Sequence, residues 1–165
     1  MKSLLLATLV ALPFTDVSDR YAPYVQPLYE EGITQGVTET QYGINQTITR
    51  GNAAVLLHRA LAPEVIRPDH IYYTDVPTRQ RTAINSLYER NYINEPLPHF
   101  RPQEKASREF IARTILNIVA GDDVPIEHIR NLGIMLGDES GNLWLGDAVT
   151  RGELAIIIQK TRDIE

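Results

Sequence analysis

Cysteine is absent from this chain of 165 residues. Without thiols the chain has no disulfides, thiolate metal sites or cysteine nucleophiles, although this does not fix its cellular compartment. A long basic cluster is also missing, and the formal net charge is −5. Both features argue against general nucleic-acid binding. The chain also lacks a glycine-rich phosphate loop, a serine elbow and a paired-acid frame, so we expect no enzymatic activity.

An apolar run at residues 4–12 is too short to cross a bilayer as a helix, so no membrane span is predicted. The run follows Lys2, as the core of an export signal does, but a clear small-x-small cleavage site is missing. Residues 1–13 are therefore either an export signal or a terminal helix that packs on the rest of the chain. Both alternatives stay open.

Three short stretches share a hydroxyl residue, then an arginine, then an apolar run with helical spacing. They are residues 48–51, 106–109 and 149–152, with Arg50, Arg108 and Arg151 as their arginines. The hydroxyl residue is predicted to cap a helix, which places the arginine in the first turn beside free backbone amides. An arginine and a helix N-terminus together make an anion site. A single such start is typical of a solvated helix end, whereas three in register indicate a shared task.

The same order of a helix, a loop and a second helix occurs three times. The first helices are predicted at residues 21–31, 78–90 and 125–132, and the second helices at residues 50–61, 108–120 and 151–161. Gly32, Asn91 and Gly133 stand where a left-handed residue ends the first helix. Because so short a helix pair cannot bury its own apolar face, we predict an all-α fold in which three helix–loop–helix repeats surround a pseudo-threefold core.

The motifs within these units have a fixed order. Phe14-x-Asp16-Val17 begins the first unit, Leu28-x-x-x-Gly32-Ile33-x-x-Gly36 follows, and an aromatic residue precedes Ile-Thr-Arg. The aromatics are Tyr42, Phe100 and Trp144, which lie eight, eight and seven residues before their arginines. This ordered set, repeated, resembles the S-layer homology repeat. The resemblance covers residues 14–62, 73–120 and a shortened third unit at 121–165, and residues 1–13 precede it.

The resemblance implies a secreted module at the bacterial cell wall or cell surface that has no catalytic activity and no cofactor. Such modules anchor proteins non-covalently to anionic secondary cell-wall polysaccharide, often of the pyruvylated N-acetylmannosamine type, in grooves between repeats. Other surface-layer proteins are a further class of partner. The alternative is a degenerate repeat protein that serves protein–protein assembly without binding carbohydrate.

The resemblance also implies the ligand-binding residues. Arg50, Arg108 and Arg151 would bind the ketal carboxylate, since an arginine fork matches a carboxylate in two hydrogen bonds and lysine does not. Gly36 and Gly137 would let a sugar approach the backbone. Tyr42 and Trp144 would lie under a sugar face, or alternatively anchor the core.

The second unit departs from this pattern, because Glu95 stands where the other units have Gly36 and Gly137. A carboxylate there would repel an anionic sugar. We therefore expect the second groove to be altered, with Arg108 facing Glu95 and paired to a carboxylate, and the sites at Arg50 and Arg151 to remain open.

Smaller features carry expectations of their own. Gly51 and Gly152, each in the first turn of a helix, are expected to widen access to the arginines. Asp16, Asp75 and Asp123 are expected to cap the first helix of each unit rather than bind ligand. No metal site is predicted, because the acidic stretch at 138–142 has neither the glycine nor the closing acid of a calcium loop.

Overall fold

The computed structural model describes residues 11–164, and within them every regular element longer than an isolated β-bridge is a helix. The helices are α1 (Ala22–Glu30), α2 (Arg50–Leu61), α3 (Thr78–Glu89), α4 (Arg108–Val119), α5 (His128–Asn131) and α6 (Arg151–Asp163). The predicted all-α class is confirmed. The alternatives for residues 1–13 fall mostly on residues 1–10, which lie outside the described part of the chain.

The second helix of each unit begins as predicted. Thr49, Ser107 and Thr150 have extended backbone and are the N-caps of α2, α4 and α6. Each side-chain oxygen accepts a hydrogen bond from the backbone N–H three residues later, at distances of 3.1–3.3 Å. These caps fix the three arginines as the first residues of their helices.

The first helices end in a shared way but differ in length. Gly32, Asn91 and Gly133 follow α1, α3 and α5 with φ of 70°, 60° and 72°, as a left-handed C-terminal cap requires. Helix α5 has only four residues, fewer than the predicted 125–132. The residues before it form bonds over three residues, such as His128 N–H to the Pro125 carbonyl, so this unit has a tight turn in place of a full helix.

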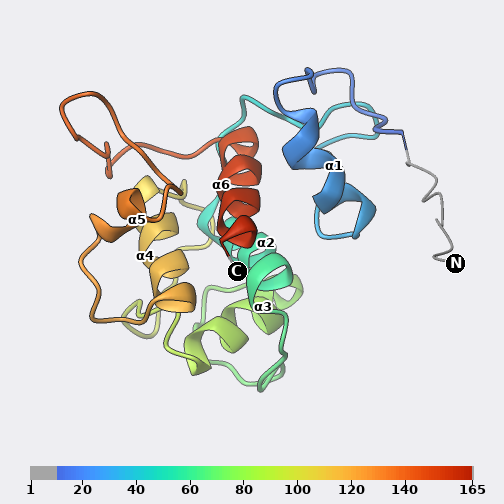
Figure 1. The fold of residues 1–165 in the computed structure, drawn as a ribbon. Coiled ribbons are helices and arrows are strands. Elements are labelled where there is room, and N and C mark those ends of the chain that lie inside the picture. Colours follow the sequence, from blue (N-terminus) through green and yellow to red (C-terminus); the bar gives the residue numbers. More distant parts are fainter. Residues whose placement is uncertain (1–10, 165) are drawn as a thin grey trace, which may run out of the picture.

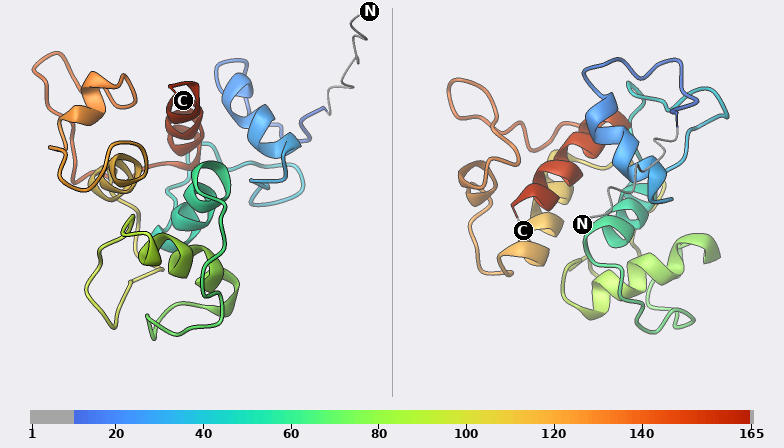
Figure 2. Two further views of the ribbon diagram at one scale, coloured as in Figure 1. Left: turned by 60° about the horizontal axis from the view of Figure 1, so that its bottom comes forward. Right: turned by 45° about the vertical axis from the view of Figure 1, so that its right-hand side comes forward.

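The helices pack in pairs that join neighbouring units. Helix α3 lies against α2, α5 against α4, and α1 against α6, while α2 also contacts α4 and α6 (Figures 1 and 2). Each first helix thus covers the apolar face of a second helix from another unit. The apolar faces of the short helices are therefore buried between units, and no helix pair has to form a core alone.

A closed cycle of backbone hydrogen bonds joins the three units at the centre. Ile48 N–H donates to the Val149 carbonyl at 3.0 Å, Val149 N–H to Ala106 at 2.9 Å, and Ala106 N–H to Ile48 at 2.8 Å. These three residues are at most 1% exposed. The cycle supports a pseudo-threefold arrangement of repeats, which together with the repeat boundaries stays a prediction.

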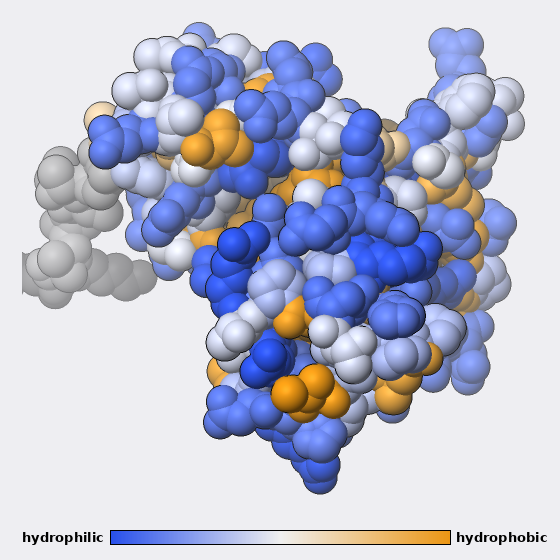
Figure 3. All heavy atoms as spheres, turned by 180° about the vertical axis from the view of Figure 1, so that it is seen from behind, coloured by the Kyte–Doolittle hydropathy of each residue, from blue (hydrophilic) through white to orange (hydrophobic). Residues whose placement is uncertain are grey.

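The exposed apolar side chains do not form one large patch on the face drawn in Figure 3, where small hydrophobic spots are separated by hydrophilic surface. Within residues 11–164, no helix has the length and apolar character needed to cross a membrane.

Candidate functional site

The helix N-termini are not the anion sites that the sequence predicted, because their amides are already bonded. The N–H groups of Arg50, Arg108 and Arg151 donate to backbone carbonyls of a neighbouring segment at 2.8 Å. The next amide in each helix does the same at 2.9–3.1 Å, and the third is bound by the cap. Since the first-turn amides are used to join the units, any anion binding must come from the guanidinium groups.

Each arginine side chain reaches into the following unit. Nε of Arg50 donates to the Phe100 carbonyl at 3.1 Å and Nε of Arg108 donates to the Leu143 carbonyl at 2.7 Å. Arg151 closes the circle by donating to the Tyr42 carbonyl in the first unit at 2.9 Å. An arginine therefore shares its surroundings with the loop of the next unit, not with the loop of its own.

The residues whose carbonyls accept these bonds show that the sequence alignment of the three aromatic residues is wrong in the third unit. Tyr42, Phe100 and Leu143 each lie eight residues before an arginine, and each is followed by a residue with positive φ. Trp144 is the residue with positive φ in the third unit, with φ of 54° and an exposed fraction of 51%. The equivalent of Tyr42 is therefore Leu143 and not Trp144.

Tyr42 is a core residue and not a sugar platform. It is 0% exposed, and its hydroxyl lies 3.2 Å from the Thr34 hydroxyl. Burial raises the pKa of its phenol above the ordinary value. A ring with no accessible face cannot stack on a ligand, so of the two alternatives for Tyr42 the structure favours the core anchor. The carbonyl of Tyr42 positions Arg151.

Asp16 and Asp75 do not cap the first helices, since α1 and α3 have no side-chain cap. Asp16 instead accepts hydrogen bonds at 2.8–3.0 Å from the N–H groups of residues 42–44, and Asp75 accepts them at 2.8–2.9 Å from Phe100 and Arg101. Burial raises the pKa of each carboxyl, but the combined N–H bonds outweigh it and hold the pKa below the ordinary value. These aspartates fix the turns whose carbonyls hold Arg50 and Arg151.

The Arg151 groove is lined by the loop at residues 33–37, by α2 and by Arg151, and has a volume of about 450 Å³. Two of its lining residues are arginines, Arg59 and Arg151, and within the described chain none of the residues that line it is acidic. Nη2 of Arg151 donates to the Gln35 carbonyl at 2.7 Å, and its guanidinium lies 4.8 Å from the Tyr42 ring centre. The partners of Arg151 are neutral, so its charge is available to a ligand.

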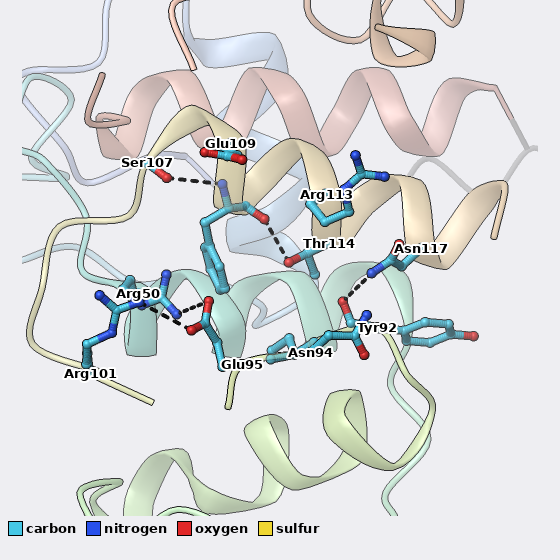
Figure 4. A pocket seen from close by; sticks show the side chains of 12 residues that line it. Arg50, Tyr92, Asn94, Glu95, Arg101, Ser107, Glu109, Arg113, Thr114 and Asn117 are labelled. Atoms are coloured by element: carbon cyan, nitrogen blue, oxygen red, sulfur yellow. Dashed lines mark hydrogen bonds and ion pairs between the residues drawn. The ribbon is translucent and has the colours of Figure 1, made fainter. Parts of the chain in front are cut away.

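The Arg50 pocket lies between α4 and the loop at residues 92–95, with a volume of about 380 Å³ (Figure 4). Nη2 of Arg50 is 2.8 Å from Oε1 of Glu95, and Arg101 is 3.2 Å from the other oxygen of the same carboxylate. The guanidinium of Arg50 also lies over the rings of Phe100 and Phe110, at 4.9 and 4.3 Å. Arg50 is 6% exposed, so its charge is both buried and paired.

The Arg108 pocket has a volume of about 360 Å³ and an acidic lining. It places Arg108 beside three acids, namely Asp138, Asp147 and Glu153. Nη1 of Arg108 is 3.9 Å from Glu153, and the indole N–H of Trp144 donates to Asp138 at 3.0 Å. Hydrogen bonds from the hydroxyl and N–H groups around Asp138 lower the pKa of its carboxyl. Trp144 presents an exposed indole here, but the pocket is unsuited to an anion.

The prediction that Arg108 faces Glu95 is therefore wrong, since Glu95 pairs with Arg50. The expectation that the Arg50 site remains open is wrong for the same reason, which is that each arginine meets the loop of the next unit and not the loop of its own. Arg108 does approach a carboxylate, but this belongs to Glu153 in α6.

The glycines of the loops have a steric role. A Cβ on Gly36 would lie 2.4–2.5 Å from the carbonyl oxygens of Thr38 and Gln41, and a Cβ on Gly137 would lie 2.4 Å from that of Asn142. Gly51 and Gly152 do not widen access to the arginines: both are buried, and a Cβ would meet Gln80 at 2.1 Å or Ile44 at 2.9 Å. Whether sugar contacts the backbone at Gly36 or Gly137 stays a prediction.

The sequence reasoning missed Arg59, the second cation of the Arg151 groove. Arg59 lies at the C-terminal end of α2, and its Nη1 donates to the Ile33 carbonyl at 3.4 Å. Nothing in the sequence distinguishes it from a solvated arginine. Within residues 11–164, no group of three histidine, aspartate or glutamate side chains is placed to hold a metal ion.

Comparison with known proteins adds three findings. Residues 13–54 match the family model of the S-layer homology domain. The chain is 25% identical over 166 residues to a cell surface protein of Thermoanaerobacter kivui, covering 92% of the chain and 21% of that protein. It is 29% identical over 105 residues to an endoglucanase of Bacillus sp. (strain KSM-635), covering 62% of the chain and 11% of that protein. The chain thus spans about a fifth of the first relative and less of the second.

Proposed function

Because this chain belongs to the S-layer homology family, we propose that it anchors to the bacterial cell surface by binding an anionic cell-wall polysaccharide in the Arg151 groove. The family match and the name of the Thermoanaerobacter relative both support a location at the cell surface. The sugar chemistry, a carboxylate-bearing unit such as pyruvylated N-acetylmannosamine, is part of the proposal. We propose no enzymatic activity for this region, although one of the relatives is named an endoglucanase.

The observation that carries the proposal is the charge of the Arg151 groove. Arg151 and Arg59 bring two positive charges to a groove whose described lining residues include no acid. Arg151 is held by two neutral carbonyls, which orient the fork without neutralising it. A prepositioned guanidinium forms charge-assisted hydrogen bonds with a carboxylate at little further entropic cost.

The net negative charge of the chain makes this local site necessary. With a formal charge of −5, this chain has no overall electrostatic attraction to an anionic polymer. Attraction must therefore come from one positively lined groove. Trp144, with its exposed indole in the Arg108 pocket, is a second contact point that would suit an uncharged sugar face of the same polymer.

Binding to purified pyruvylated wall polymer tests the proposal. The wild-type chain should co-sediment with the polymer, and Arg151→Ala should lose most of this binding, by about tenfold to a hundredfold, because a charge-assisted fork is removed. Arg108→Ala is the matched control, since that arginine also begins a helix but lies in an acidic pocket, and it should bind nearly as wild type does. Unchanged binding by Arg151→Ala would contradict the proposal.

One observation favours the second candidate, a degenerate repeat used in protein assembly. The charge of Arg50 is already paired within the chain. If the wild-type chain does not bind the polymer, this second function is the one that remains.

A further inference from the structure

The Arg50 pocket and the Arg151 groove begin from the same local structure. Each arginine is the first residue of its helix, donates through Nε to the carbonyl of a buried aromatic residue, and lies within 5 Å of an aromatic ring centre. What differs is the partner of the outer nitrogen. It is a neutral carbonyl of Gln35 for Arg151 and the carboxylate of Glu95 for Arg50.

Glu95 supplies Arg50 with a carboxylate partner from within the chain. Its Oε1 forms an ion pair with Nη2 of Arg50 at 2.8 Å. Its second oxygen is bound by Arg101 at 3.2 Å, as Figure 4 shows. Both oxygens of this internal carboxylate therefore have a cationic partner.

The backbone around Glu95 is built to hold it there. The other two units have Gly36 and Gly137 at this position, where a Cβ would come within 2.4 Å of backbone atoms. The second unit has a side chain at this position, its loop to Phe100 is one residue shorter, and the Tyr73 hydroxyl donates to the Glu95 carbonyl at 2.9 Å.

We propose that Glu95 is a specificity-determining residue: as an internal carboxylate it saturates Arg50 and closes the Arg50 pocket to anionic ligands. If Glu95 were neutralised, neither Arg50 nor Arg101 would be paired with its carboxylate. Both line the pocket, and Arg113 lines it as well. The lining of the pocket would then carry these three arginines and one remaining acid, Glu109, so its charge would become net positive, like that of the Arg151 groove. This inference rests on the proposed function in taking the Arg151 groove as the site of the anionic sugar.

The experiment uses the full chain with Arg151→Ala, which removes the proposed site. Its probes are the pyruvate ketal of N-acetylmannosamine and uncharged N-acetylmannosamine, with affinity measured by calorimetry. Adding Glu95→Gln should strengthen binding of the ketal by at least about tenfold and leave the uncharged sugar unaffected. Adding Arg50→Lys to this double variant should reduce the gain, because lysine cannot form the fork.

The outcomes separate this inference from the proposed function. If the wild-type chain binds the ketal through Arg151 but Glu95→Gln adds nothing, the inference is overturned and the function stands. If the wild-type chain does not bind and the Glu95→Gln variant does, the function fails and the inference stands.

A second measurement keeps the test valid if Glu95→Gln fails to fold. In the Arg151→Ala chain with Glu95 intact, the ring resonances of Phe110 should not shift on addition of the ketal, because the pocket is closed to it. A saturable shift of these resonances would overturn the inference.

Discussion

The Arg50 pocket and the Arg151 groove show how one motif acquires opposite roles. Both arginines follow a threonine cap and begin an apolar helix. Arg50 is 6% exposed and ion-paired, whereas Arg151 is partly exposed and held by carbonyls. The difference lies in the loop of the neighbouring unit, which has Glu95 beside Arg50 and Gly36 at the equivalent position beside Arg151, and which is one residue shorter beside Arg50. The sequence motif therefore places an arginine at the start of a helix, and the loop of the neighbouring unit determines whether its charge is available to a ligand.

The largest effect should come from truncating the two arginines. Arg50→Ala should lower the free energy of unfolding by about 3 kcal/mol, because it breaks a buried ion pair and removes packing on two rings. Arg151→Ala should lower it by about 1 kcal/mol, because its hydrogen bonds are to neutral carbonyls at a partly exposed site. Urea unfolding of both variants measures the contrast, and equal losses would mean that Arg50 is no more structural than Arg151.

The next effect concerns the loop of the Arg151 groove. Gly36→Ala should destabilise the chain by about 2 kcal/mol or more, since its Cβ would meet backbone carbonyls that cannot move aside. Gly146→Ala is the control, because a Cβ there meets nothing within 4 Å and φ is not positive. Thermal unfolding of the pair checks this. Similar melting temperatures would show that the loop at residues 33–37 is adaptable.

A matched pair of aspartates should separate the two sites further. Asp16→Asn weakens the turn whose Tyr42 carbonyl holds Arg151, and Asp75→Asn weakens the turn at Phe100 beside Arg50. Each should cost about 1–2 kcal/mol, because hydrogen bonds from N–H groups to a carboxylate become bonds to a neutral amide. Only Asp16→Asn should also reduce polymer binding. Equal reduction by both variants would argue against the Arg151 groove as the sole anionic site.

The smallest expected effect is a pH dependence of the stability of α2, which contains His58. His58 is 5% exposed and burial holds its pKa below the ordinary value of 6.5, so the folded state binds this proton more weakly than the unfolded chain does. The stability from the neutral imidazole is complete above pH 6.5 and decreases as the pH falls below that value. The protection factors of the amides in α2, which are corrected for the intrinsic pH dependence of exchange, should therefore fall in mild acid, and His58→Gln should abolish this fall. An unchanged pH profile in this variant would assign the effect to other groups.

Much of the fold could be predicted from the sequence because the helix ends depend on local chemistry. The caps at Thr49, Ser107 and Thr150, and the left-handed residues Gly32 and Asn91, act within a few residues of themselves. Their positions in the sequence are therefore enough to place the helix ends. The site was less readable, since Arg59 and Glu95 come within reach of their partners only through packing between units.

The sequence by itself determined the all-helical class and the three capped helix starts that each begin with an arginine, and it predicts three similar units. Only the tertiary structure decided which loop each arginine meets. Backbone bonds between units consume the first-turn amides, and each guanidinium extends into the next unit of the cycle. The pairing of Arg50 with Glu95 and the free charge of Arg151 follow from that geometry, because the electrostatics of a site depend on distances that sequence separation does not specify.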